Sequence, residues 1–182
     1  MTGPDPVVDP AGQPAAVRGA TAAVRAALVA AGVDWAQTGP AAFTATLPGS
    51  HRLATTVSLL VGGHTLSVNA FVARRPEENA AEVYAWLLGR NARLPGVAFA
   101  LDRLGDVYLV ARLPLAAVSE AEVDRLLGAV LTAADDSFDR ILELGFASAI
   151  RREWAWRRAR GEPVGNLAAF AHLLGTPGGA AG

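Results

Sequence analysis

The sequence predicts an α+β fold: an antiparallel sheet of about five strands covered by helices, in the order α-β-β-β-α-β-β-α, with a C-terminal helical extension. Two kinds of pattern predict it. Short alternating apolar stretches are separated by glycine-containing turns, which is typical of antiparallel hairpins. Longer stretches with apolar residues three and four positions apart stand before, between and after them, which is typical of amphipathic helices. At 182 residues the chain has the length of one domain.

The chain begins with a predicted helix followed by a predicted strand. Residues 15–31 carry apolar side chains at helical spacing, and the glycine at position 32 suits the end of such a helix. Residues 33–35 begin an irregular, extended stretch. Residues 43–47 alternate between apolar and polar side chains, and the Pro-Gly pair at 48–49 ends this strand.

Residues 53–72, LATTVSLLVGGHTLSVNAFV, predict a hairpin. Gly62 and Gly63 would form a two-residue turn that needs positive φ at both positions. The resulting register pairs Val61 with His64, Leu59 with Leu66, Val57 with Val68, and Leu53 with Val72. All of these side chains then share one face, so a slip by one residue would expose the apolar set to water.

A second helix is expected from Pro76 to Arg90, because acidic residues stand at its start and an apolar stripe follows. The stripe consists of Ala80, Val83, Trp86 and Leu87.

A second hairpin is expected over residues 96–115. Asp102 and Gly105 occupy the first and fourth positions of a type I turn, with Gly105 in a left-handed bulge. The register then pairs Leu101 with Val107, Phe99 with Leu109, and Val97 with Ala111. The alternative is an acid/base site made of Asp102, Arg103 and Asp106, but no histidine lies near them in the sequence. We therefore interpret these residues as a turn with a solvated tip.

The third helix has the clearest beginning, since Ser119 and Glu122 form a capping box. Its apolar stripe runs to a predicted end at Gly145, and its outer face is acidic. The following segment, residues 147–160, is basic and holds two tryptophans. The candidate partner-binding residues of this region are Arg151, Arg152, Trp154, Trp156, Arg157, Arg158, Leu167, Phe170, Leu173 and Leu174.

Two interpretations of the basic segment stay open. Arginine binds phosphates and carboxylates while tryptophan stacks, so the segment could contact nucleic acid or an anionic surface. In the other interpretation Ile150 and Trp154 pack onto the domain, and the arginines face the acidic third helix of the same chain or of a second subunit. The predicted organisation is a disordered lead (1–14), an α+β domain (15–146), a helical extension (147–175) and a disordered tail (176–182).

Composition narrows the classes of function. The absence of cysteine excludes disulfides, thiol nucleophiles and cysteine–zinc sites, and a net charge of −1 gives no general attraction to nucleic acid. His51, His64 and His172 have no partners at metal-ligand spacing, and no nucleophile or cofactor-binding motif is present, so we expect no enzyme, metal or cofactor. No apolar stretch is long enough to span a membrane. We expect a cytoplasmic protein.

The block of residues 87–138 resembles the YbjN-domain family of bacterial sensory transduction regulators. Its matching features are Leu87-Leu88, Asn91, Phe99-Ala-Leu-Asp102, Gly105-Asp-Val-Tyr-Leu109 and Arg112-Leu-Pro-Leu115. The resemblance implies a fold like that of type III secretion chaperones, and it implies dimerisation. It brings no catalytic residue, because the matching positions are turn and core residues.

Together these observations predict a non-enzymatic, chaperone-like protein-binding module in bacterial stress or sensory regulation. We expect it to form a homodimer and to recruit an unidentified protein or extended peptide across a sheet edge or an apolar groove. The alternative is a nucleic-acid or anionic-surface binder acting through residues 151–160.

Overall fold

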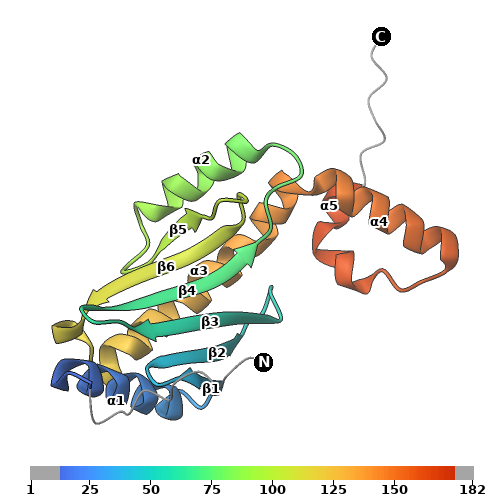
Figure 1. Cartoon of the computed structure of the whole chain (residues 1–182). Helices are drawn as coiled ribbons and strands as arrows, with labels where there is room; N and C mark the ends of the chain where they lie inside the picture. The colour runs from blue at the N-terminus through green and yellow to red at the C-terminus, as the bar shows by residue number, and fades with distance from the viewer. Residues whose placement is uncertain (1–12, 175–182) are drawn as a thin grey trace, which may run out of the picture.

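The computed structural model describes residues 13–174, which form two parts (Figure 1). The body, residues 13–146, is a six-stranded antiparallel sheet in the order β1-β2-β3-β4-β6-β5, with helices packed on it. The arm, residues 147–174, is helical and projects from the end of the longest helix. The predicted α+β class is therefore confirmed.

The secondary structure elements follow each other in chain order. They are α1 (Ala15–Ala30), β1 (Asp34–Gly39), β2 (Ala42–Pro48), β3 (Ala54–Val61), β4 (Thr65–Ala73), α2 (Ala80–Asn91), β5 (Ala98–Leu101), β6 (Val107–Pro114), α3 (Glu120–Gly145), α4 (Ala147–Arg160) and α5 (Ala171–Leu174). Short 3₁₀ turns stand at Leu115–Ala117 and Gly165–Phe170.

The core lies between one face of the sheet and the helices. Buried and open residues alternate along β2, β3, β4 and β6, since successive side chains of a strand point to opposite faces. Phe43, Leu59 and Leu109 on the sheet belong to one buried cluster with Leu28 and Ile141 on the helices. In Figure 1 α3 passes behind the sheet, and the face toward the viewer carries no helix. One face of the sheet thus stays open.

The sheet has six strands where the sequence predicted about five. The missed strand is β1, which pairs with β2 and contains a register shift between Gln37 and Gly39. Its burial does not alternate, and Trp35 is the side chain that packs on the core, with its ring 6.0 Å from that of Phe43. The segment lacked the periodic signal of a strand because β1 is a polar edge strand.

The predicted register of the first hairpin is wrong by two residues. Val61 pairs with Leu66 and Leu59 with Val68, around a longer loop that Gly62 closes by donating its N–H to the Thr65 carbonyl oxygen at 2.8 Å. Neither Gly62 nor Gly63 has positive φ, so the turn is not the predicted two-residue type. A shift of two residues keeps every side chain on its face, so the hydrophobic pattern could not reveal it.

The predicted register of the second hairpin is confirmed where β5 pairs with β6. Phe99 lies opposite Leu109 and Leu101 opposite Val107. Gly105 has a φ of 85°, and its N–H donates to the Asp102 carbonyl oxygen at 3.1 Å. The Asp102 side chain accepts from the amides of Leu104 and Asp106 at 2.8 and 2.9 Å.

The helix ends agree with the sequence except at the start of α2. That helix begins at Ala80 rather than Pro76, because Asn79 adopts a left-handed conformation with a φ of 49°. Ser119 caps α3 by accepting from the Glu122 amide at 3.2 Å, and α3 ends at Gly145 as predicted. The side chain of Glu122 binds Arg125 instead of completing the capping box.

Candidate functional site

A small apolar hollow lies between α2 and the edge strand β5. We call it the leucine crevice; it has a volume of about 140 Å³ and is lined by Tyr84, Leu87, Leu88, Phe99, Ala100 and Leu101. Leu88 is 68% exposed and Leu101 46% exposed, and Leu104, in the turn after β5, is 72% exposed. Large aliphatic side chains exposed together are typical of a surface that binds another protein.

The geometry of the crevice depends on contacts between α2 and the β5–β6 hairpin. The hydroxyl of Tyr84 donates to the Gly105 carbonyl oxygen at 3.1 Å, which ties the middle of α2 to the turn. Asp106 accepts from the Arg75 amide at 2.8 Å and is half-buried, so it is not part of a solvated tip as the sequence suggested. Asp102, Gly105 and Asp106 therefore stabilise the turn and its contact with α2.

Asn91 closes the outer edge of β5. Its amide oxygen accepts from the Phe99 N–H at 2.7 Å, and its amide nitrogen donates to the Phe99 carbonyl oxygen at 3.1 Å. Along an edge strand, every second residue turns both its N–H and its C=O away from the sheet, where an added strand would bind them. Phe99 is such a residue of β5. The side chain of Asn91 therefore blocks strand addition at this position, and the expected recruitment of a peptide across the sheet edge is not favoured here.

The opposite edge, β1, is protected in another way. The register shift between Gln37 and Gly39 bends the strand, and Arg25 of α1 donates to the Gln37 side chain at 2.7 Å. Bulges and edge-covering side chains are devices that keep sheets from pairing with other chains. Contacts between side chains are thus better suited than strand addition for recognition by this protein.

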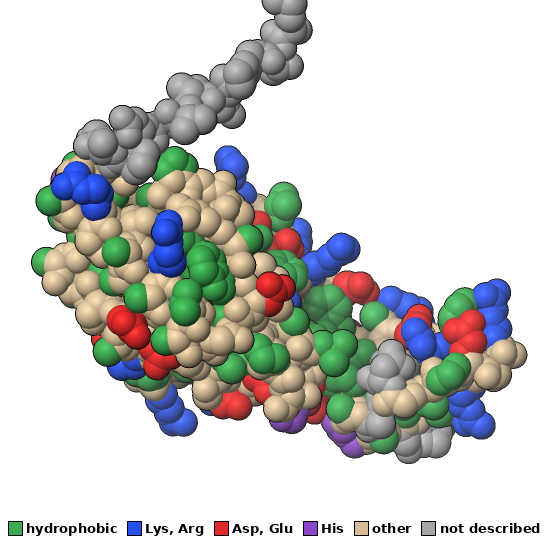
Figure 2. All heavy atoms as spheres, turned by 90° about the horizontal axis from the view of Figure 1, so that it is seen from below, with side chains coloured by type: hydrophobic (Ala, Val, Ile, Leu, Met, Phe, Trp, Pro, Cys, Tyr) green, Lys and Arg blue, Asp and Glu red, His purple; other side chains and the backbone are tan. Residues whose placement is uncertain are grey.

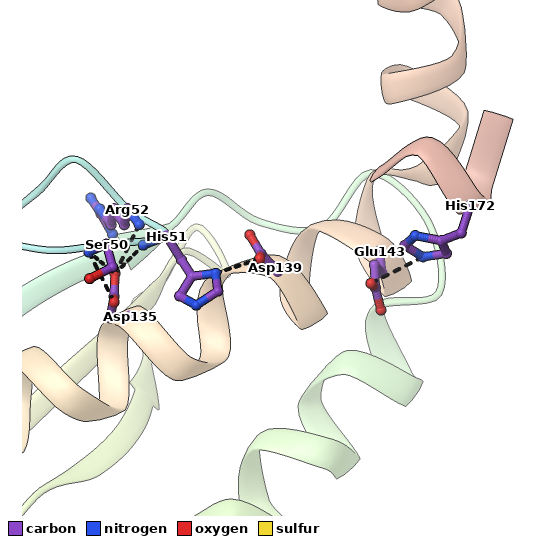
Figure 3. Close-up of polar contacts among 7 residues, drawn as sticks. All are labelled: Ser50, His51, Arg52, Asp135, Asp139, Glu143 and His172. Carbon is purple, nitrogen blue, oxygen red and sulfur yellow. Dashed lines mark hydrogen bonds and ion pairs between the residues drawn. The ribbon is translucent and has the colours of Figure 1, made fainter. Parts of the chain in front are cut away.

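Figure 3 shows a ridge of acidic side chains on α3 that holds two distant segments. Asp135, Asp139 and Glu143 are spaced four residues apart and share one face of the helix. We call them the acidic ridge. Asp139 Oδ2 lies 2.8 Å from His51 Nδ1 in the loop between β2 and β3, and Glu143 Oε1 lies 3.1 Å from His172 Nε2 in the arm.

Asp135 binds the backbone of that loop. Its carboxylate accepts from the amides of Ser50, His51 and Arg52 at 3.0, 2.9 and 2.9 Å. Burial alone would raise the pKa of Asp135, but the three backbone hydrogen bonds outweigh it and lower the pKa. A Cβ atom at Gly49 would lie 2.6 Å from the same carboxylate, so the loop needs glycine there.

The neighbouring ion pair, between His51 and Asp139, changes the pKa of the histidine. The hydrogen bond and the charge of Asp139 raise the pKa of His51 above its ordinary value, although the imidazole is largely exposed. Spacing in the sequence could not link His51 to its acidic partner, because His51 and Asp139 lie 88 residues apart.

The predicted partner-binding arginines of the arm lie on α4, and each already has a contact within the chain. Arg151 donates to the Leu173 carbonyl oxygen at 3.0 Å, and Arg152 lies 3.2 Å from Glu77. Arg157 lies 2.6 Å from Glu153. The guanidinium of Arg158 lies 4.8 Å from the ring centre of Trp154.

None of the ion pairs among the described residues joins an α4 arginine to α3. Within the described part of one chain the arginines therefore do not pair with the acidic third helix, and Arg152 reaches the segment before α2 instead. A pairing with the third helix of a second subunit stays a prediction. Beside Arg152, Glu78 accepts from the amide and hydroxyl of Ser148 at 2.6 and 3.0 Å. The periodicity of the sequence could not show these contacts between α4 and the segment before α2, because the helix breaks after Gly145 and α4 begins as a separate helix.

The apolar residues of the arm form a small cluster together with Leu142 and Phe146 at the end of the body. Phe170 is buried against Ile150, and Trp154, Leu173 and Leu174 pack around them. Trp156 is 43% exposed, with the Arg160 guanidinium 4.4 Å from its ring centre. The side chain of Leu167, and residues 1–12 and 175–182, lie outside the described residues. In Figure 2 basic and acidic side chains are interleaved on the arm, at the right of the view.

Within residues 13–174 no helix is both long and apolar enough to cross a membrane. Over the same range no group of three or more histidine or acidic side chains is arranged to hold a metal ion.

Comparison with known proteins identifies the family. A family model with the description "YbjN: Putative bacterial sensory transduction regulator" matches residues 21–143. The chain belongs to the YbjN family. The match begins within α1, ends two residues before the end of α3, and leaves out the arm.

Mycobacterial relatives of this YbjN protein are close in sequence. The uncharacterized protein Rv0487 of Mycobacterium tuberculosis is 53% identical over 137 residues, which is 75% of each chain. The uncharacterized protein ML2442 of Mycobacterium leprae is 52% identical over 132 residues, or 72% of each chain.

Two solved structures show a more distant likeness. The crystal structure of the ExsC-ExsE complex contains a chain with 18% identity and a TM-score of 0.45, covering 66% of this chain and 93% of that one. The heterodimeric ExoU-SpcU complex from the type III secretion system of Pseudomonas aeruginosa contains one with 17% identity and a TM-score of 0.46, covering 66% and 95%.

Proposed function

We propose that this YbjN protein is a non-enzymatic, chaperone-like regulatory module of the bacterial cytoplasm that binds a partner protein through the leucine crevice. The observation that carries the proposal is an apolar hollow lined by the exposed Leu88 and Leu101, with Leu104 exposed in the turn that follows β5. The family description, a sensory transduction regulator, agrees with a role exerted by binding.

The crevice fits one or two apolar side chains of a partner better than an added strand. Its volume of about 140 Å³ is close to that of a single leucine-sized group, and Asn91 occupies the backbone groups of Phe99. Burying each exposed leucine would contribute about 1.5 kcal/mol or more, and a few such anchors carry most of the energy of a protein interface.

A homodimer is part of the proposal, on the resemblance to the YbjN family, and its contact leaves the leucine crevice open to the partner. Light scattering that shows only monomer at tens of micromolar would count against the dimer.

The test replaces surface leucines without touching the core. The double variant Leu88→Gln and Leu104→Gln should lose the partner, and Val29→Gln on α1 is the matched control because Val29 is 63% exposed away from the crevice. Affinity purification from the native cell compares both variants with the wild type and with a chain that ends at residue 146. Equal recovery of the partner by wild type and double variant would refute the crevice as the binding surface.

The alternative, binding of nucleic acid or an anionic surface through residues 151–160, has weaker support. Arg151, Arg152 and Arg157 are engaged by groups of the same chain, and Glu153 neutralises part of the charge. A salt titration of binding to random duplex and single-stranded DNA tests it, since phosphate contacts weaken steeply with salt. Binding absent even at low salt excludes the alternative.

The non-enzymatic part of the proposal has its own test. Turnover of any substrate by the purified protein that is lost on replacing one polar residue would overturn it.

A further inference from the structure

The open face of the sheet contains a hollow that the leucine crevice does not explain. It has a volume of about 640 Å³ and is formed where β4, β6 and β5 lie side by side. We call it the sheet trough; it is lined by Ser67, Asn69, Gly96, Val97, Ala98, Ala100, Val110, Ala111 and Arg112. A hollow of this size falls within the range of small-molecule sites, about 300–1,000 Å³.

One charged side chain, that of Arg112, lines the trough. Arg112 is exposed on β6, and none of the ion pairs among the described residues includes it. This sets it apart from the arginines of α4 that have partners. Its cross-strand neighbour is Ser67, and Asn69 lies two residues further along β4 on the same face. A guanidinium beside a hydroxyl and an amide offers several hydrogen-bond donors with one positive charge.

The rest of the trough is apolar. Ala98 and Ala100 from β5 and Val110 from β6 line it, and no acidic residue does. A second hollow, of about 260 Å³, adjoins it through Asn69, Ala100 and Val110. Its far end is lined by Tyr108, Leu101 and Asp102, so the one acidic residue of this lining lies at the end away from Arg112. From Arg112 to Tyr108 the strand spans about 13 Å, since each residue advances the chain by about 3.3 Å.

We propose that the sheet trough binds a small monocarboxylate with an unbranched or extended apolar body, whose carboxylate pairs with Arg112. A single guanidinium forms a bidentate pair with a carboxylate, whereas a phosphate dianion would need more cations or backbone amides than the trough supplies. The apolar body lies along Ala98, Ala100 and Val110 toward Tyr108. This chemistry occurs in fatty acids and in the C-terminal residues of peptides.

The experiment follows backbone amide resonances of the full chain by NMR during titration with octanoate and, separately, with the acetylated tripeptide Ala-Leu-Val bearing a free C-terminus. Octanamide and the amidated tripeptide are the matched neutral probes. We expect saturable shifts at Ser67, Asn69, Ala98 and Arg112 with an acid, and binding at least about tenfold weaker with its amide. The acid that binds more tightly identifies the source of the carboxylate.

Three variants test the assignment. Arg112→Gln should weaken binding of the acid about tenfold, because a hydrogen bond to a charged group is lost. Arg93→Gln, an exposed arginine outside the trough, should leave binding unchanged. Ala98→Leu fills the trough from the open face and should reduce binding of acids and amides alike. Equal binding of acid and amide, no saturable shift at the trough, or equal loss with Arg93→Gln would overturn the proposal.

Discussion

In the body, one cluster of buried side chains joins α1, α2 and α3 to the sheet, whereas in the arm Ile150 and Phe170 are the buried hydrophobic residues among those described. The body is therefore held by burial of apolar surface, which grows with the size of the core. The arm has a small apolar contact with the body, through Leu142 and Phe146, and adds polar contacts at its base: Ser148 with Glu78, Arg152 with Glu77, and His172 with Glu143.

This difference teaches that the two parts should respond differently to the same kind of substitution. An isolated segment with so small a core cannot fold stably alone, so the arm stays attached only while its contacts to α3 and to the segment before α2 persist. Five predictions test the comparison, ordered by their expected effect on the stability of the body.

The largest effect is expected in the core of the body. Leu109→Ala on β6 removes a fully buried side chain and should lower the free energy of unfolding by about 3 kcal/mol, because it leaves a cavity. Urea unfolding followed by circular dichroism measures the change. Leu88→Ala on the exposed face of α2 should stay within about 0.5 kcal/mol. A loss below about 1 kcal/mol for Leu109→Ala would show that the core does not hold the body as described.

A smaller effect is expected where the acidic ridge holds the loop before β3. Asp135→Asn should lower the free energy of unfolding by about 1 kcal/mol, because a neutral amide accepts the three backbone hydrogen bonds more weakly and the site is partly exposed. Asp136→Asn, which removes only a loose contact with Arg90 at 3.9 Å, is the control. Similar urea midpoints for the two variants would contradict this role.

The contribution of Asp135 also depends on pH. Its folded-state pKa is lowered, so the stabilisation is complete above the ordinary carboxyl pKa of about 3.9 and is lost as the pH falls through the lower folded value. The difference between wild type and Asp135→Asn should therefore shrink in acid.

In the arm, Ile150→Ala should leave the unfolding of the body within about 0.5 kcal/mol of the wild type while it releases the arm. Loss of the contact with Phe170 removes the centre of the small cluster. Limited trypsin digestion should then cut faster after the arginines of α4, and Ile150→Val should behave nearly as the wild type. An unchanged digestion rate for Ile150→Ala would mean that the polar contacts alone hold the arm.

The smallest effect concerns His51, which is exposed. Its pKa is raised by Asp139, so the ion pair is fully formed below the ordinary histidine pKa of about 6.5 and is lost as the pH rises through the folded value. NMR titration of the His51 ring should show that Asp139→Asn lowers its pKa. Identical titration curves in both proteins would exclude the contact.

Much of the body followed from local patterns. The turn from Asp102 to Gly105, the cap at Ser119 and the end of α3 at Gly145 were predicted because each depends on residues within a few positions of each other. The register of the first hairpin was wrong because a two-residue shift leaves the hydrophobic pattern unchanged.

The candidate sites were less predictable. The alternation of apolar and polar side chains along β4 and β6 showed which residues face away from the core. It could not show that Ser67, Asn69 and Arg112 border one hollow. Asn91 stood among the residues that resemble the YbjN family, yet its contact with Phe99 became visible only in three dimensions.

The amino-acid sequence by itself determined the α+β class, the apolar face of each strand and the turn and cap residues, because these depend on neighbours along the chain. Only the tertiary structure decided that both sheet edges are protected, that the acidic ridge holds His51 and His172, and that Arg112 lacks an ion-pair partner among the described residues. Such contacts join residues far apart in the sequence, and their distances are set by packing of the whole body.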